Sequence, residues 1–330
     1  MEKNPPPPSS ETSGRPLRIV FMGTPALAAH VLECLASQGG DEMTVVGVVT
    51  RPDQPRRRGL RLEPSAVAIV AARHGIPTLK PIKIRTPEFL AELRAFAPDV
   101  IVVVAYGHIL PNPVLALAPP INVHASLLPR HRGAAPIEGA ILAGDHESGV
   151  TIMRITEQMD AGPILLQRSI PLAADETQGS LKEKLAALGA RALIDAIRLF
   201  RQGALPETAQ DENLATYTTL VKKEASVIDW TSDAIRIERT VRAYNPWPVA
   251  RTSCGGEDLL IWRATVADAS PATGVPGEPG TIVRMKPAPV VRCGAGLLAL
   301  LEVQAPGRRR IPAADFLRGR RVAVGARLGT

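Results

Sequence analysis

The sequence predicts an α/β protein of two domains, a domain with a mainly parallel sheet followed by a smaller β-barrel domain. Strand-like and helix-like stretches alternate over the first two thirds of the chain, as in parallel sheets with crossover helices. The last third carries short apolar runs separated by Gly and Pro, as in small barrels. The length of 330 residues also exceeds the roughly 250–300 residues at which single cores stop growing.

In the first domain, the strand candidates are short runs rich in Val and Ile, which suit strands buried on both faces. They are Arg18–Met22, Thr44–Thr50, Val100–Ala105, Ile121–Ala125 and Val150–Ile155. Helices are predicted from the turn Gly23-Thr24-Pro25 to about Ser37, and over Ser65–His74, Pro87–Phe96, Ala135–Ala143 and Thr177–Gln202. The Gly-x-Gly-x-x-Gly fingerprint is absent, so no dinucleotide-binding loop is expected.

Beyond the first domain, Gly203–Leu220 has few helix or strand signals and is interpreted as a linker. A helix over Ser232–Ala243 follows and ends at Asn245-Pro246-Trp247-Pro248. The predicted barrel strands are Leu259–Trp262, Gly280–Arg284, Pro289–Arg292 and Leu297–Val303. The expected division is a disordered Pro-rich tail at 1–16, an α/β domain at 17–203, a linker at 204–222 and a β domain at 223–330.

Composition excludes several classes of protein. No apolar run approaches the roughly 18 residues of a membrane span, and the N-terminal segment lacks the apolar core of an export signal. The three cysteines form no Cys-x-x-Cys spacing, and the six histidines have no metal-ligand spacing. We therefore expect a cytoplasmic protein with neither a disulfide framework nor a metal.

The net charge of +7 is concentrated in the last third of the chain. Residues 223–330 hold 16 Lys and Arg against 10 Asp and Glu, a balance of +6. This excess favours a polyanionic partner, although a genome rich in arginine codons would produce the same bias.

The strand Ile121–Ala125 places an amide and an imidazole on one face. Side chains two positions apart on a strand point the same way, so Asn122 and His124 should project together while Val123 packs on the opposite side. An amide N–H and a protonated imidazole can stabilise an oxyanion. A polar pair without a catalytic role is the plain alternative.

An acid is expected to join this pair. The strand Val150–Ile155 leads into Gln158-Met159-Asp160-Ala161-Gly162, and ligands of open α/β sheets collect beyond the carboxyl ends of strands. We therefore expect Asp160 to reach His124 from the carboxyl end of a neighbouring strand.

The run from Asn122 to Pro136, with Gly149–Met153 and Met159–Gly162, resembles the signature of formyltransferases that use 10-formyltetrahydrofolate. The stretches Phe21–Pro25, Val104–Gly107 and Asn245–Pro248 are similar to the branch acting on methionyl-tRNA. The resemblance covers about residues 17–330. It implies a Rossmann-like catalytic domain and an OB-like tRNA-binding domain. It also implies formyl transfer from 10-formyltetrahydrofolate, a co-substrate, to the methionine amine of initiator methionyl-tRNA, without a metal, for translation initiation.

By this resemblance Asn122, His124 and Asp160 are the catalytic residues, and Ser126, Leu127, Leu128 and Pro129 contact the folate. The amide and imidazole would bind the oxyanion formed when the amine attacks the formyl carbon, and Asp160 would help collect the amine proton. Ala125 departs from the glycine that is frequent at its position, with little expected effect. The protein is expected to act as a monomer.

The loop from Arg51 to Arg61 holds five arginines and one acid in eleven residues. Its prolines and Gly59 predict irregular structure, and in isolation it could be a solvated surface loop. The resemblance implies that it approaches the tRNA acceptor end, with Arg58 matching the family arginine. The candidate tRNA-binding residues are Arg56, Arg57, Arg58 and Arg61, and Arg308–Arg310, Arg318, Arg320 and Arg321 would add phosphate contacts.

Three other functions are open at this point. A formyltransferase with another amine acceptor, such as an amino-sugar nucleotide, would share the catalytic residues but not the need for basic surfaces. A folate hydrolase would use water in place of the amine. A non-catalytic RNA-binding protein would have no use for an intact Asn122, His124 and Asp160.

Overall fold

The computed structural model describes residues 15–56, 61–268 and 277–329, which form two compact units. The first unit extends to Pro136 and includes Glu147–Pro171 and Lys182–Thr218. The second contains Ile137–His146, Leu172–Leu181 and the described residues from Thr219 onward. Two short stretches expected in the first domain thus belong to the second unit.

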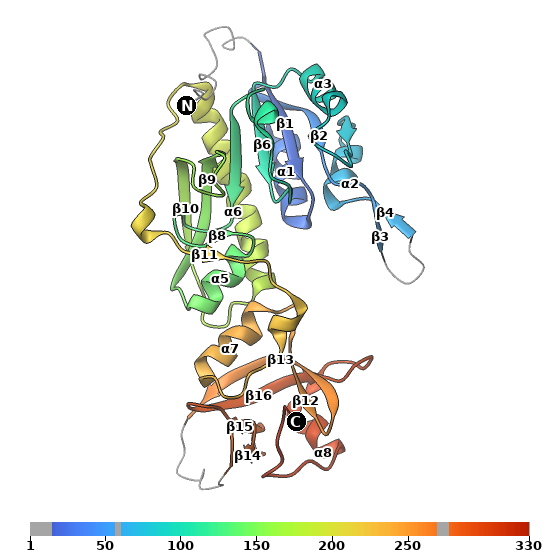
Figure 1. The fold of residues 1–330 in the computed structure, drawn as a ribbon, viewed down its shortest axis with the longest axis vertical. Helices are drawn as coiled ribbons and strands as arrows, with labels where there is room; N and C mark the ends of the chain where they lie inside the picture. The colour runs from blue at the N-terminus through green and yellow to red at the C-terminus, as the bar shows by residue number, and fades with distance from the viewer. Residues whose placement is uncertain (1–14, 57–60, 269–276, 330) are drawn as a thin grey trace. The chain divides into compact units, whose positions relative to one another are not determined.

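The first unit is built on a seven-stranded sheet with the order β10-β9-β7-β6-β1-β2-β5 (Figure 1). The last five strands in this order are parallel to one another. Their arrangement is Rossmann-like, with the reversal of strand order between β1 and β6, so the predicted class is confirmed. The strands are β1 (Leu17–Gly23), β2 (Met43–Val49), β5 (Thr78–Leu79), β6 (Val100–Val104), β7 (Pro120–His124), β9 (Glu147–Arg154) and β10 (Ile164–Pro171).

The two remaining strands break the parallel pattern. β9 runs antiparallel to β7, with Ile121 opposite Arg154, and β10 runs antiparallel to β9. The carboxyl end of β9 therefore lies beside the start of β7, and the expected route of Asp160 from a parallel strand is wrong. The connection 155–163 instead brings Asp160 back toward the imidazole of His124.

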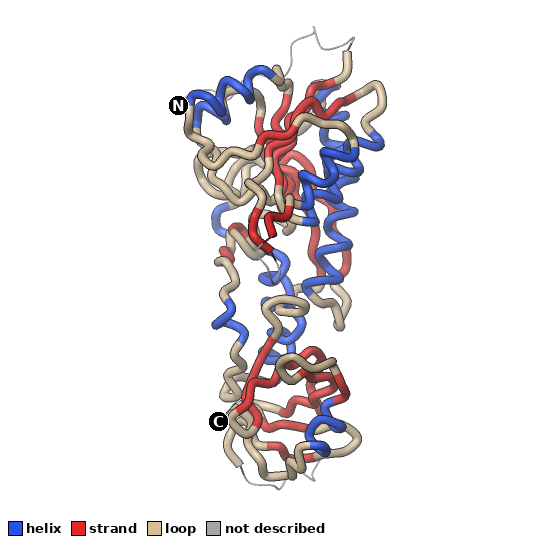
Figure 2. Tube along the Cα trace, turned by 90° about the vertical axis from the view of Figure 1, so that its right-hand side faces the viewer, coloured by secondary structure: helices blue, strands red, loops and turns tan. Residues whose placement is uncertain are grey.

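Helices lie on both faces of this sheet (Figures 1 and 2). On one face, Val20, Met22 and Val103 share a core cluster with residues of α3 and α4. On the other, Gly189 of α6 lies against Val123 and Val150. The helices are α1 (Ala26–Gln38), α2 (Ala66–Arg73), α3 (Pro87–Ala95), α4 (Asn112–Leu115) and α6 (Gln178–Arg201).

Two short strand pairs complete the first unit. β3 (Gln54–Arg56) and β4 (Arg61–Glu63) form an antiparallel hairpin, so the ends of the basic loop are regular, contrary to expectation. β8 (Arg132–Gly133) pairs in parallel with β11 (Tyr217–Thr218). The segment interpreted as a linker therefore contains β11, and also the 3-10 helix η2 (Glu212–Leu214). Its pairing depends on backbone contacts that leave no periodicity in the sequence.

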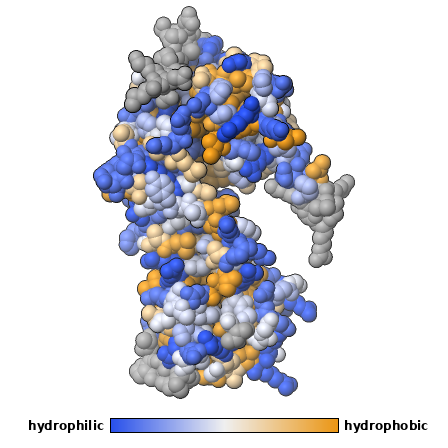
Figure 3. Space-filling model, in the orientation of Figure 1, coloured by the Kyte–Doolittle hydropathy of each residue, from blue (hydrophilic) through white to orange (hydrophobic). Residues whose placement is uncertain are grey.

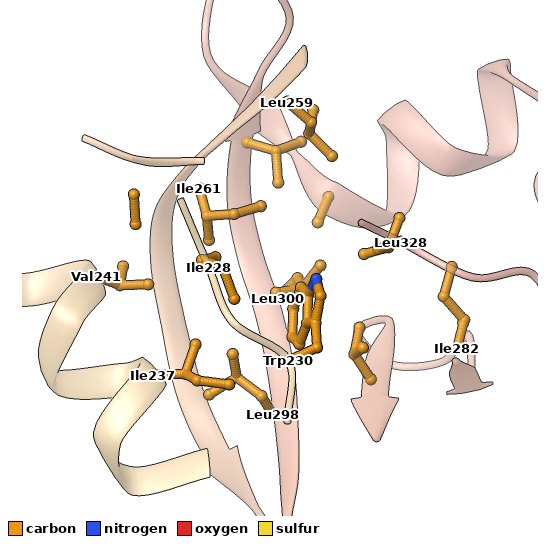
Figure 4. Packing of buried hydrophobic residues seen from close by; sticks show 14 of the residues in the cluster. Ile228, Trp230, Ile237, Val241, Leu259, Ile261, Ile282, Leu298, Leu300 and Leu328 are labelled. Atoms are coloured by element: carbon orange, nitrogen blue, oxygen red, sulfur yellow. The ribbon is translucent and has the colours of Figure 1, made fainter. Parts of the chain in front are cut away.

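The second unit contains an antiparallel sheet with the order β12-β13-β16-β15-β14, and β17 pairs with β16. Trp230, Leu298 and Leu300 lie in its core, against Ile237 and Val241 of α7 (Figure 4). The indole N–H of Trp230 donates to the Thr252 hydroxyl at 3.0 Å. The elements are α5 (Pro136–Ala143), η3 (Lys223–Ser226), α7 (Ala234–Ala243), β12 (Ala250–Cys254), β13 (Glu257–Ala267), β14 (Ile282–Arg284), β15 (Val290–Arg292), β16 (Leu297–Gln304), β17 (Ile311–Pro312) and α8 (Ala313–Gly319).

Hydrophilic side chains predominate on the face shown in Figure 3. Within the described ranges, none of the helices combines the length and apolar character needed to cross a membrane.

Candidate active site

The strand β7 places Asn122 and His124 on the same side of the sheet. Asn122 is paired with Val103, whose side chain belongs to the cluster under α3 and α4. The intervening Val123 faces the other way, toward Gly189 of α6. Asn122 and His124 therefore face away from α6, as the two-residue period predicts.

The imidazole of His124 is buried and has a different partner on each nitrogen. Its Nε2 lies 3.0 Å from the carbonyl oxygen of His131. Its Nδ1 lies 3.7 Å from Oδ2 of Asp160. A carbonyl oxygen only accepts, so Nε2 carries a proton in this arrangement and Nδ1 is directed toward the carboxylate.

The carboxylate of Asp160 lies near His124 and is also held by a backbone N–H group. The backbone N–H of Gly133 donates to Oδ2 at 2.8 Å. Asp160 has a φ of +53°, a conformation uncommon for residues other than glycine. The carboxylate is 16% exposed, which leaves it accessible to a bound group.

Together, His124 and Asp160 form an acid–base pair that is not in direct hydrogen-bond contact, since 3.7 Å exceeds the usual limit. An incoming polar group that lies to one side of the pair can hydrogen-bond to both. Asn122, from the same strand and face as His124, adds an amide donor at this end of the sheet. Such a set of groups is suited to attack on a carbonyl carbon.

The segment Ser126–Pro129 forms a tightly bonded turn after β7. The Ser126 hydroxyl donates to the Arg130 carbonyl at 2.6 Å, so it is used inside the turn. Thr151 on β9 donates to the Ser126 carbonyl at 2.7 Å and accepts from the Leu128 N–H at 3.1 Å. Leu128 is buried and Leu127 partly buried, and the peptide between Leu128 and Pro129 is cis. The turn is a rigid rim beside His124.

A second set of residues gathers where the strand order reverses, after β1 and β6. A Cβ atom on Gly23 would lie 2.8 Å from the Val104 carbonyl oxygen, so the two strand ends approach closely only because this residue is glycine. Thr24 donates to the Tyr106 carbonyl at 3.3 Å. Arg51 donates to the Gly107 carbonyl at 2.5 Å, which joins the base of the basic hairpin to this turn.

Tyr106 is buried in this turn, and its hydroxyl has no hydrogen-bond partner among the described residues. Burial raises the pKa of Tyr106 to about 12, while the positive charge of Arg51 acts in the opposite direction. The phenol is therefore neutral at ordinary pH and offers a donor.

The candidate tRNA-binding arginines are only partly described. Arg56 and Arg61 are paired across the hairpin of β3 and β4, while Arg57 and Arg58 lie outside the described residues. In the second unit, the guanidinium of Arg310 lies 3.2 Å from the ring centroid of Trp262. Arg318 and Arg320 form ion pairs with Asp315 and Glu257, and Arg308 and Arg309 are exposed.

No group of three or more His, Cys, Asp or Glu that could hold a metal occurs in the part of the chain that the structure describes.

Gln210 and Arg132, which have no role predicted from the sequence, are linked to Asp160. The side-chain amide of Gln210 donates to the backbone carbonyl of Asp160 at 2.8 Å. Its oxygen accepts from the buried guanidinium of Arg132, at 2.9 Å from Nη2. Arg132 belongs to the run from Asn122 to Pro136 that resembles the family signature. Gln210 lies in the segment interpreted as a linker, where no sequence pattern indicates a role for it.

Comparison with known families divides the chain in two. Residues 17–197 match the family described as formyl transferase, and residues 220–321 match the formyl transferase C-terminal domain. Residues 198–219 lie between the two matches.

Individual relatives resemble nearly the whole chain. A methionyl-tRNA formyltransferase of Roseiflexus sp. strain RS-1 is 47% identical over 316 residues, 95% of this chain and 96% of the relative. One from Methylococcus capsulatus is 46% identical over 95% of this chain and 100% of the relative. Among solved structures, an N-formyltransferase of Helicobacter canadensis, in complex with folinic acid and dTDP-3-aminofucose, has a TM-score of 0.63 at 17% identity. The alignment covers 86% of this chain and 98% of that one, a likeness of fold.

Proposed function

The chain belongs to the methionyl-tRNA formyltransferase family, and we propose that it moves the formyl group of 10-formyltetrahydrofolate to the α-amine of methionyl-tRNA. The observation that carries this proposal is the similarity to such enzymes over 95% of the chain. The polar groups on β7 and in the 155–163 connection supply a chemistry that fits it. The product, N-formylmethionyl-tRNA, serves translation initiation.

In the proposed reaction, the methionine amine attacks the formyl carbon on N10 of the folate. A carbon–nitrogen bond forms, the carbonyl becomes an oxyanion, and the amine nitrogen becomes positively charged. Asn122 donates to the oxyanion, as does His124 when protonated. Asp160 accepts the proton that the amine loses, directly or through water. The bond from carbon to N10 then breaks, N10 gains a proton, and tetrahydrofolate leaves.

We assign the reacting nitrogen of His124 from its contacts. Because Nε2 is held by the His131 carbonyl at 3.0 Å, Nδ1 is the nitrogen that faces the acid and the reacting groups. The 3.7 Å between Nδ1 and Oδ2 leaves the two groups free to act on different atoms of the tetrahedral intermediate. This division of labour needs no covalent enzyme intermediate.

We propose that the folate binds between the turn after β6 and the rim Ser126–Pro129. Both follow strands whose carboxyl ends meet at one edge of the sheet, next to the point where strand order reverses. Leu127 and Leu128 are the apolar residues of that rim, and Tyr106 is buried in the turn. The Ser126 hydroxyl is already bonded to Arg130, so Ser126 contributes by shaping the rim.

For the tRNA, we propose two basic surfaces of different kinds. The basic loop 51–61, whose sequence includes Arg56, Arg57, Arg58 and Arg61, starts at Arg51, which touches the turn after β6. It is therefore attached close to the reacting groups, where the acceptor end must lie. Arg308 and Arg309 of the second unit supply contacts to tRNA phosphates that do not depend on the nucleotide sequence.

We further propose a monomer that acts in the cytoplasm. Cys34, Cys254 and Cys293 are all free thiols, as suits a reducing compartment. Mass measurement by light scattering in solution tests the oligomeric state.

An acceptor competition tests the proposed function. The protein is incubated with 10-formyltetrahydrofolate, charged initiator methionyl-tRNA and an amino-sugar nucleotide in one reaction. The expected product is the formylated methionyl ester, with tetrahydrofolate released in equal amount. Formylation of the sugar instead, folate hydrolysis without a formylated acceptor, or tRNA binding without turnover would each refute the proposal.

A further inference from the structure

The segment 208–218 is hydrogen-bonded to two stretches beside the imidazole of His124. One is the end of the 155–163 connection, and the other contains His131 and Arg132. Thr208 exchanges backbone hydrogen bonds with Ile164, at the end of the 155–163 connection. Farther along, the Thr216 hydroxyl accepts from the His131 N–H at 2.8 Å, and its carbonyl accepts from the Arg132 N–H at 2.8 Å. The carbonyl that anchors Nε2 and the acid that faces Nδ1 are thus tied to the same stretch of chain.

Within this segment, Gln210 joins the Asp160 loop to Arg132. Its Nε2 donates to the carbonyls of Asp160 and Gly162, at 2.8 and 2.7 Å. Its Oε1 accepts from Nε and Nη2 of Arg132, at 3.1 and 2.9 Å. A guanidinium has no acceptor and a carbonyl has no donor, so the orientation of the amide is fixed by its partners.

Arg132 is in turn held in one position. It is fully buried, and its remaining contacts go to Glu212 and to the hydroxyl of Tyr217. The hydrogen bond with Glu212 raises the pKa of Arg132, although burial acts in the opposite direction. A buried guanidinium whose N–H donors all have acceptors is a firm support for the amide of Gln210.

The Asp160 loop needs such a support because its backbone is unusual. Asp160 has a positive φ, a backbone conformation that is unfavourable for most residues other than glycine. Without the two hydrogen bonds from Gln210, the loop is free to relax toward a commoner conformation, which would turn the carboxylate away from His124.

We propose that Gln210, oriented by Arg132, is a positioning residue that holds the carboxylate of Asp160 at its working distance from His124. This inference rests on the proposed function, since it concerns proton removal from the attacking amine. It assigns a role in formyl transfer to a segment that lies between the two family matches.

The test is a double-mutant cycle with Gln210→Glu and Asp160→Asn, assayed by steady-state formylation of methionyl-tRNA. Gln210→Glu keeps the acceptor for Arg132 but removes both donors to the loop, and should lower kcat by about 10- to 100-fold with little change in KM for either substrate. In the Asp160→Asn background the same change should have almost no further effect, because the group that it positions is already lost. If Gln210→Glu melts below the assay temperature, Gln210→Met replaces it. The same loss of kcat, and the same absence of a further loss in the Asp160→Asn background, are then expected.

Glu207→Gln is the matched control. Glu207 immediately precedes this segment and accepts from Arg154, with Nε to Oε1 at 3.0 Å, and no contact of its side chain with Asp160 or Arg132 is seen. It should lower the melting temperature slightly and leave kcat unchanged. An unchanged kcat in Gln210→Glu, losses that add fully in the double variant, or an equal kcat loss in Glu207→Gln would overturn the proposal. Failure of the wild-type chain to formylate methionyl-tRNA would instead refute the proposed function.

Discussion

His124 and Asp160 follow opposite ends of an antiparallel strand pair, yet their side chains lie 3.7 Å apart. His124 ends β7, whereas Asp160 follows the far end of β9 and returns through the 155–163 connection. The pairing is therefore a property of a loop that must be held in place. The contacts of that loop with Gly133 and Gln210 are as much a part of the site as the reacting groups themselves.

Asn122 is expected to act through its amide N–H. Asn122→Ala removes a donor to the oxyanion and should lower kcat by about 10²–10³-fold. Asn122→Asp has the same shape but presents a negative charge to the oxyanion, so its loss should be at least as large. Single-turnover rates measure both, and a wild-type rate for the Asp variant would contradict this role.

The basic loop 51–61 is expected to bind tRNA and not folate. Arg58→Ala should raise KM for methionyl-tRNA, leave KM for 10-formyltetrahydrofolate unchanged, and reduce the slope of log affinity against log salt by about 1. Arg73→Ala is the control, since Arg73 is an exposed arginine of the same unit paired with Glu33 at 2.8 Å. Affinity for tRNA that does not change with salt would rule this assignment out.

Gly133 is expected to be irreplaceable. It has a φ of +105°, and a Cβ atom there would lie 2.2 Å from the Thr218 carbonyl oxygen, so any side chain would push β8 and β11 apart. Gly133→Ala should reduce the free energy of unfolding by more than about 2 kcal/mol. Gly75→Ala, at a positive φ in open space, should cost about 1 kcal/mol. Denaturant titration compares them, and equal costs would show that the predicted clash is relieved.

Tyr106 is expected to make stability fall at alkaline pH. Burial raises its pKa from 10.0 to about 12, so between these values the unfolded phenol ionises while the folded one stays protonated. Its contribution is complete below pH 10 and is lost as pH rises through about 12. Tyr106→Phe should remove this part of the decline, on the order of 2 kcal/mol. If the free energies of unfolding of the two proteins fell equally with pH across this range, the prediction would be wrong.

Much of the fold follows from the alternation of apolar runs. The Val-rich stretches and the helices between them indicate a parallel sheet, and the two-residue period correctly places Asn122 and His124 on one face and Val123 on the other. Each of these inferences depends only on residues close together in sequence.

The features that the sequence did not reveal depend on contacts between distant segments. The reversed direction of β9 is set by its pairing with β7, and nothing in the residues Val150–Ile155 distinguishes a parallel from an antiparallel strand. The contacts of Gln210 with Arg132 and Asp160 join residues far apart along the chain, and a lone glutamine in a polar segment carries no signal. Arg57 and Arg58 remain a prediction, because they lie outside the described residues.

The central claim, that the imidazole of His124 takes part in formyl transfer, is tested most directly by single-turnover formylation of methionyl-tRNA by His124→Ala, with affinity for 10-formyltetrahydrofolate measured as the check on folding. The account predicts a rate about 10²–10⁴-fold below wild type with folate affinity retained. A near-normal rate in the folded variant would contradict it.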